Sequence, residues 1–70
     1  MAGIWDEIFL SNPKFVRYER KRKDDPAADW EYIIALRYDS DLGLKFLMEM
    51  FGTFVQEFPD YRVRVKPQHN

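Results

Sequence analysis

The sequence predicts a small α+β domain with the element order α-β-β-α-β. Apolar residues recur at helical spacing in two segments and alternate with polar residues in three others, and prolines or aspartates separate these segments. The chain has 70 residues, 46% hydrophobic and 17% aromatic, which suits one domain with one core. We expect a three-stranded, mainly antiparallel sheet covered by one long helix, with a short additional N-terminal helix.

The first predicted element is a short helix over residues 3–11. Its apolar residues fall at i, i+1, i+4 and i+5, on one side of a helix; they are Ile4, Trp5, Ile8 and Phe9. Asp6 and Glu7 lie near the N-terminus, where the helix dipole favours acidic side chains. Pro13 ends the helix because the residue before a proline is displaced from helical geometry.

Two predicted strands follow and form a hairpin. Residues 14–23 alternate around Val16 and Tyr18, and residues 30–39 show the most regular alternation in the chain. One face of this second strand holds Trp30, Tyr32, Ile34, Leu36 and Tyr38. The acidic connection between the strands is short, which favours antiparallel pairing.

The main helix is predicted over residues 41–58, with Ser40 in the capping region. Its core stripe consists of Leu44, Leu47, Met48, Phe51, Phe54, Val55 and Phe58. A last strand covers residues 61–66, Pro67 terminates it, and residues 67–70 form a frayed tail. The strand order stays open. If the first strand is in the centre of the sheet, every pairing is antiparallel. If the second strand is in the centre, it pairs with the last strand in parallel.

Composition and motifs argue against several functional classes. The chain has no cysteine, which excludes a disulfide scaffold and a thiolate zinc site. Its single histidine, His69, lies in the predicted tail, and no hydroxyl side chain has a base at a recognisable spacing. The glycines do not form a phosphate-binding loop, and Pro26 interrupts the acidic turn that could hold a hard cation. We expect no enzyme, catalytic residue, cofactor or metal site.

The sequence also bears on location. No apolar run approaches the roughly 20 residues needed to span a bilayer. The N-terminus lacks the basic flank and the uniform apolar stretch of a signal peptide. We therefore expect a cytoplasmic protein without a membrane partner.

A second apolar ridge is predicted on the main helix. Leu42, Phe46 and Met50, spaced i, i+4 and i+8, fall outside the core stripe. A helix packed on a single sheet does not need this ridge, so it either faces a partner or receives the N-terminal helix. The N-terminal helix has one apolar face and could instead cover the open side of the sheet over Ile33 and Ala35. Because it cannot do both, one of these surfaces is expected to face a partner.

Charges segregate along the hairpin. The first strand is basic, and acidic residues follow directly from Asp24. If the first and last strands are neighbours, one sheet face carries Phe15, Arg17, Lys21, Arg62, Arg64 and Lys66. Cations beside an aromatic ring on an open sheet are what a platform for single-stranded nucleic acid needs. The net charge of −1 and the pI near 5.7 instead favour an ordinary solvated face.

From these observations we favour a non-catalytic binding module that acts by occupancy, as a stoichiometric inhibitor or adaptor on a larger protein or nucleoprotein complex. Its predicted contact residues are Leu42, Phe46 and Met50 on the helix, with Arg20, Arg22, Asp24 and Asp25 in the hairpin. The comparison with small phage-encoded inhibitors such as anti-CRISPR proteins is one of size and style, and no motif carries it. The alternatives are a single-stranded RNA or DNA binder that uses the basic face, and a homodimeric structural subunit.

Overall fold

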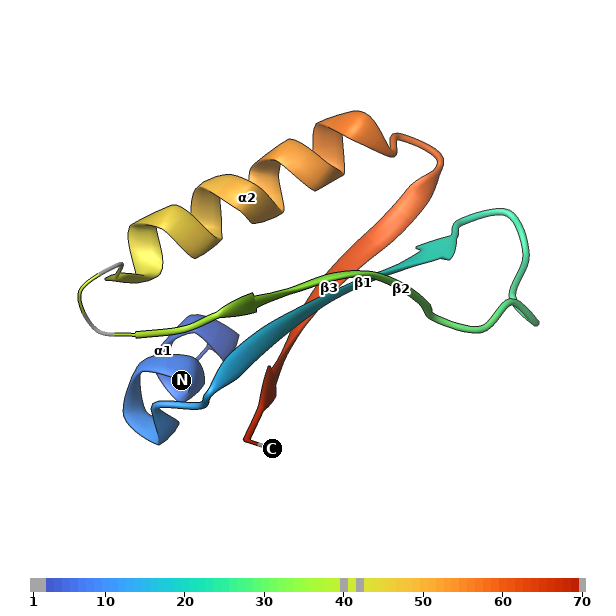
Figure 1. Cartoon of the computed structure of the whole chain (residues 1–70). Coiled ribbons are helices and arrows are strands. Elements are labelled where there is room, and N and C mark those ends of the chain that lie inside the picture. The colour runs from blue at the N-terminus through green and yellow to red at the C-terminus, as the bar shows by residue number, and fades with distance from the viewer. Residues whose placement is uncertain (1–2, 40, 42, 70) are drawn as a thin grey trace.

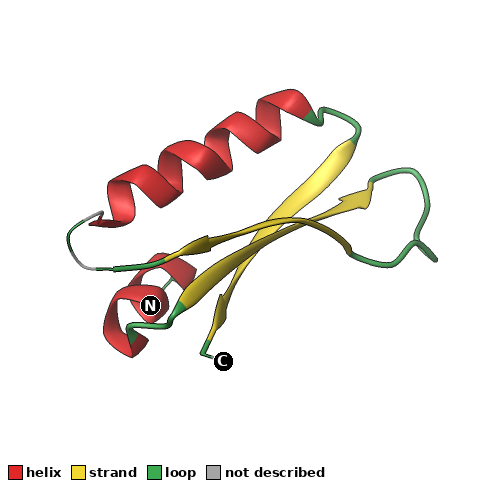
Figure 2. Cartoon of the chain, in the orientation of Figure 1, coloured by secondary structure: helices red, strands yellow, loops and turns green. Residues whose placement is uncertain are grey.

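The computed structural model describes residues 3–39, 41 and 43–69. Its elements in chain order are α1 (Ile4–Ser11), β1 (Phe15–Arg22), β2 (Glu31–Arg37), α2 (Gly43–Glu57) and β3 (Tyr61–Gln68) (Figure 1). The predicted α+β class and the α-β-β-α-β order are confirmed. The three strands form one layer, and α2 runs along one side of it (Figure 2).

The central strand of the sheet is β1, in the order β2-β1-β3, and both of its pairings are antiparallel. β2 and β3 therefore run parallel to each other on either side of β1. Parallel strands cannot be joined by a tight turn, and α2 provides the crossover between them. The hairpin and this crossover together decide the strand order that the sequence leaves open.

The last strand is longer than predicted. β3 continues through Pro67 to Gln68, so the prediction that the strand ends at Lys66 is wrong. Pro67 pairs with Val16 in the register of an edge strand. An edge strand accepts proline because half of its N–H groups face away from the sheet.

A β-bulge interrupts the pairing of β1 with β2. Tyr18 pairs with Ile34, but the next residue, Glu19, pairs with Tyr32. Ile33 is therefore an extra residue on β2, and the alternation of side chains between the two faces changes phase there. A strictly alternating strand was the expectation for this segment, and the sequence carries no signal for the extra residue.

The bulge divides the face predicted for residues 30–39. Leu36 packs against the core and Tyr38 is buried in it. Trp30 and Tyr32 instead lie on the opposite side of the sheet, where their rings contact arginine side chains. The prediction that all the alternating residues share one face is therefore wrong.

The hydrophobic core lies between the sheet and the two helices. Its buried hydrophobic members are Ile8, Val16, Tyr18, Tyr38, Leu47 and Val65. The Tyr18 hydroxyl donates a hydrogen bond of 2.7 Å to the carbonyl oxygen of Leu47, and its ring meets Phe54 edge-on at 5.3 Å between centroids. This buried phenol is therefore satisfied as a donor, as buried polar groups require.

The core stripe of α2 is narrower than predicted. Met48 and Val55 were expected to be buried, but they are 48% and 45% exposed. At about 100° per residue, these two positions lie at one margin of the stripe, roughly 80–100° from Leu47. α2 packs mainly against β3, an edge strand, so no further strand lies beyond it to cover that margin.

The short helix α1 packs at the end of the sheet, on the same side as α2. Ile8 is fully buried in the core, and the Trp5 ring meets Phe51 of α2 edge-on at 5.9 Å between centroids. Phe9 was expected on this buried face but is 62% exposed. α1 was expected either against the main helix or over the open side of the sheet at Ile33 and Ala35. Its contacts with the core and with Phe51 show that it does not cover the open side.

Alkaline pH should weaken the fold through Tyr18. Burial raises the pKa of Tyr18 well above its ordinary value. The unfolded chain releases this proton near pH 10, whereas the folded protein retains it, so stability falls as the pH rises above about 10. Thermal melting followed by circular dichroism should show a steeper alkaline decline for the native protein than for Tyr18→Phe. Parallel declines would contradict this assignment.

Candidate functional site

The sheet has a face without a helix, opposite α2, which we call the open face. Strand alternation and register assign to it, from β1, Phe15, Arg17, Glu19 and Lys21. From β3 it receives Arg62, Arg64, Lys66 and Gln68, and from β2 it receives Tyr32, Ala35 and Arg37. All the residues of the predicted basic platform therefore lie on one face.

A buried carboxylate lies at the centre of the open face. Glu19 is 5% exposed. Arg64 Nε donates to its Oε1 at 2.8 Å, and Arg17 Nε lies 3.1 Å from its Oε2 without hydrogen-bond alignment. A buried carboxylate is costly unless it is paired, and here one partner comes from β1 and the other from β3.

Both arginines also stack on aromatic rings. The Arg17 guanidinium lies over the Tyr32 ring at 5.0 Å, and the Arg64 guanidinium lies over the Trp30 ring at 4.1 Å. Glu19 and these four residues form what we call the arginine–aromatic row. Ion pairing on one side and stacking on the other restrict the rotamers of both guanidinium groups, so the row is a preorganised surface.

The charge of the open face differs sharply from that of the whole chain. Its basic residues are Arg17, Lys21, Arg37, Arg62, Arg64 and Lys66, and Glu19 is its one acid among the strand residues. The rest of the sequence holds five basic and eleven acidic residues. The net charge of −1 therefore conceals a polarised molecule, and a ligand that approaches the open face experiences a positive field.

The basic surface continues to one end of the sheet. A cavity of about 380 Å³ there is lined by Asn12, Pro13, Lys14, Arg37, Tyr38, Asp39 and His69. Arg37 belongs both to this cavity and to the open face, where it pairs with Phe15 in the register. Beyond the start of β1 this cavity offers the basic Lys14 together with the acidic Asp39.

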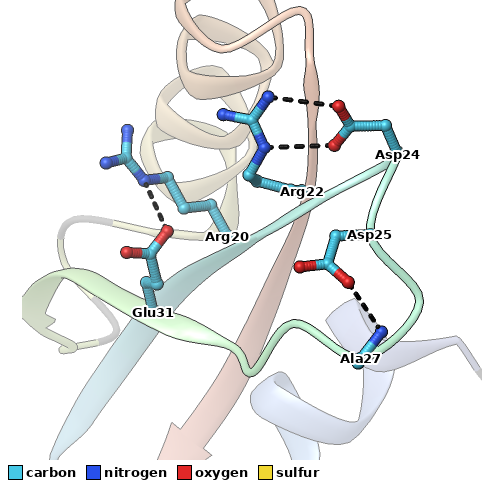
Figure 3. Close-up of polar contacts among 6 residues, drawn as sticks. All are labelled: Arg20, Arg22, Asp24, Asp25, Ala27 and Glu31. Atoms are coloured by element: carbon cyan, nitrogen blue, oxygen red, sulfur yellow. Dashed lines mark hydrogen bonds and ion pairs between the residues drawn. The ribbon is translucent and has the colours of Figure 1, made fainter.

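The charged hairpin residues predicted to contact a partner all have polar contacts within the chain (Figure 3). Arg22 binds both carboxylate oxygens of Asp24, with Nε–Oδ1 at 3.1 Å and Nη2–Oδ2 at 3.2 Å. This hydrogen bonding and the charge of Arg22 lower the pKa of Asp24. Asp25 Oδ1 accepts a 3.0 Å hydrogen bond from the backbone N–H of Ala27. These contacts shape the turn.

Arg20 differs from its neighbours because it belongs to the helix side of the sheet. Its guanidinium lies over Phe58 at 4.5 Å and over Tyr61 at 4.4 Å, and its Nε lies 3.6 Å from Glu31 Oε1 (Figure 3). The side chain therefore covers the end of the core where α2 passes into β3. These contacts within the chain explain the position of the Arg20 side chain, and no contact with another protein is needed for it.

The predicted ridge on α2 is not formed as expected. Phe46 is 41% exposed, but Met50 is half-buried and packs against the core. The flexible methionine side chain can reach the core from the flank of the helix, a freedom that helical spacing does not reveal. Leu42, the third member of the ridge, lies outside the described residues.

Sequence reasoning missed Glu19, the buried carboxylate of the open face, and three further residues of this face. Trp30 and Tyr32 were assigned to the core face because the bulge at Ile33 was not foreseen. Arg37 was not considered part of the platform because its position opposite Phe15 follows only from the register. The available signals for an aromatic surface were Trp30, directly before the strand, and Tyr32 within it. Their spacing alone does not decide which face of the sheet they occupy.

No protein family, curated protein or solved structure matches the chain. Among residues 3–39, 41 and 43–69, no cluster of histidine or acidic side chains could hold a metal ion. No helix in the same described part is long and apolar enough to cross a membrane. The case for a function therefore depends on the open face itself.

Proposed function

We propose that this chain is a non-catalytic binding module and that its open face binds single-stranded nucleic acid. The observation that carries the proposal is the arginine–aromatic row, which lies with four further basic residues on a sheet face without a helix. Phosphates require cations distributed along a path, and unpaired bases require flat groups on which to stack. The open face supplies both.

The dimensions of the open face suit a short segment of nucleic acid. Its side chains run along β1 from Phe15 to Lys21. At roughly 3.3 Å per residue this path is about 20 Å long. Sheet platforms that bind single strands cover about 4 nucleotides or more, so the open face has the length of a minimal site.

The helix α2 lacks the basic surface of a helix that recognises duplex DNA. A recognition helix needs basic or amide side chains that enter the major groove. α2 carries one basic residue, Lys45, together with Glu49 and Glu57. The basic residues instead lie on a sheet surface, which is the geometry of single-strand recognition.

Salt dependence provides the first test. Four basic residues of the open face are not in the ion pairs with Glu19: Lys21, Arg37, Arg62 and Lys66. Four phosphate contacts to a single strand give a slope of log Kobs against log salt of about −3. Binding of a labelled single-stranded octanucleotide, followed by fluorescence anisotropy, should weaken about 50-fold between 50 and 200 mM salt. A matching duplex should bind more weakly.

Charge-removal variants locate the site. Lys21→Gln and Lys66→Gln should each weaken binding and reduce the salt slope by about 0.7. Lys45→Gln on α2 removes the same charge from an exposed position outside the open face, so it serves as the matched control. The proposal fails if the octanucleotide does not bind at 50 mM salt, or if Lys45→Gln weakens binding as much as the other two substitutions.

A second candidate function is occupancy of a larger protein by an inhibitor or adaptor. It is supported by the exposed apolar residues Phe9 and Leu10 of α1, which are 62% and 77% accessible. Exposed apolar groups of this kind are typical of docking surfaces. A stoichiometric protein partner that survives nuclease treatment and is lost with Phe9→Asp would favour this function. A partner that disappears with nuclease would favour the open face.

A further inference from the structure

The strand with the longest apolar run in the sheet has no buried residue. β2 contains five consecutive apolar or aromatic residues, from Tyr32 to Leu36, yet each is half-buried or exposed. Tyr32 is 57% exposed and Ile34 is 36% exposed. β1 and β3 both contain buried residues. Apolar surface of this extent on one strand normally has a partner.

β2 is uncovered because of where the helices lie. It forms one edge of the sheet, and α2 packs mainly against β3 at the other edge. The contact of Trp5 with Phe51 marks the side of α2 that faces α1 and β3. Phe46 is 41% exposed and lies about 140° around the helix from Phe51, so it points away from the side of α2 that meets α1 and β3.

The two edges of the sheet differ in their protection. β3 carries Arg62, Lys66 and Pro67, residues of the types that discourage pairing with another strand. β2 has no charge and no proline between Tyr32 and Leu36, and the β-bulge at Ile33 is the one feature of this stretch that is typical of a protected edge. An apolar edge without these residues is a template for strand addition.

We propose that the β2 edge pairs with the β2 edge of a second copy of this chain, antiparallel, in a two-fold symmetric dimer with one continuous sheet. The charges of the strand favour this occupant. β2 begins with Glu31 and ends with Arg37. Antiparallel pairing brings the acidic start of each strand beside the basic end of the other, whereas parallel pairing places like charges together.

The exposed area of the single chain supports the same conclusion. The chain exposes 5131 Å². A compact monomer of its mass, 8.5 kDa, is expected to expose about 4,700 Å². The excess belongs to the chain as a whole, and the exposed apolar residues that contribute to it include Tyr32 and Ile34 of β2 as well as Phe9 and Leu10 of α1.

One hydrogen bond shows how the edge is occupied in the single chain. The backbone N–H of Ala35 donates to the Tyr32 hydroxyl at 3.0 Å, so this N–H is not part of the ladder with β1. In the dimer a carbonyl group of the second β2 takes the place of the hydroxyl.

The two-fold axis keeps both open faces on the same side of the continuous sheet. Formation of the dimer does not depend on what those faces bind.

The native mass and three variants test the dimer. Light scattering from micromolar to millimolar concentration should show the mass rising from 8.5 kDa toward twice that value. Ala35→Pro removes an N–H that β1 does not use, and Ile34→Lys places a charge in the interface; each should raise the dimer dissociation constant at least about tenfold. Tyr32→Phe removes the competing hydroxyl and should lower the constant about fivefold.

Val55→Lys on α2 is the matched control, because Val55 is also an exposed apolar residue but lies on the margin of α2 away from β2. Circular dichroism establishes that each variant is folded. The mass of a single chain at every concentration would overturn the dimer. The dimer would also be overturned if the Ile34→Lys and Val55→Lys variants had the same dimer dissociation constant. Octanucleotide binding by a monomeric variant would show that the proposed function holds separately.

Discussion

Substitution of Leu47 by alanine should lower the free energy of unfolding by about 2–5 kcal/mol, a large share of the stability of a domain this small. The side chain is 1% exposed and lies in the core between α2 and the sheet. Its removal loses the burial of the side chain and leaves a cavity that the surrounding residues cannot fully close. A domain of this length has a total stability of only about 4–10 kcal/mol.

The neighbouring residue provides the control for Leu47→Ala. Met48 is also apolar and helical but is 48% exposed, so Met48→Ala should cost under about 1 kcal/mol. Urea denaturation followed by far-ultraviolet circular dichroism measures both. If both substitutions cost the same, Leu47 does not occupy the centre of the core.

Substitution of Glu19 by glutamine should change stability and binding in opposite directions. The amide keeps the shape of the side chain but loses the charge that holds Arg17 and Arg64. Loss of these charge-assisted contacts should cost about 1–2 kcal/mol of stability, a figure reduced because both arginines are partly exposed. Both guanidinium groups then become available to phosphates, so affinity for single strands should rise about tenfold or more.

The salt slope distinguishes this mechanism from a general effect of charge. Two additional phosphate contacts should steepen it by about 1.4. Glu49→Gln removes an acidic charge from the exposed side of α2 and should leave both the stability and the salt slope nearly unchanged. If affinity falls when Glu19 is neutralised, the carboxylate is needed to position the two arginines and does not compete with phosphate.

The elements of the fold could be predicted because their signals are local. Helical spacing in the segment around Leu47 and alternation around Val16 and Tyr18 arise from the geometry of a single helix or strand. The cap and breaker residues around Pro13 and Pro59 act on their nearest neighbours. Each of these elements was placed within two residues of its observed bounds, and β3 differs in kind because it continues through Pro67, which was expected to end it.

The candidate site could be predicted only in part, because it depends on contacts between distant segments. Its basic residues were recognised as a set, on the condition that the first and last strands are neighbours. The aromatic residues Trp30 and Tyr32 were assigned to the other face, since an extra residue at Ile33 reverses the alternation without a mark in the sequence. Met50 was placed outside the core stripe, yet it packs against the core, because helical spacing gives a direction but not the reach of a side chain.

The sequence by itself determined the secondary structure, the α+β class, the absence of cysteine chemistry and the segregation of charge along the chain, because these depend on residue type and on spacing within one element. The tertiary structure alone decided that β1 is central, that Glu19 lies between arginines of two strands, and that β2 is left uncovered. The physical reason is that strand order, register and helix placement minimise the free energy of the whole chain. Many arrangements satisfy the local preferences, and the packing of residues far apart in sequence selects among them.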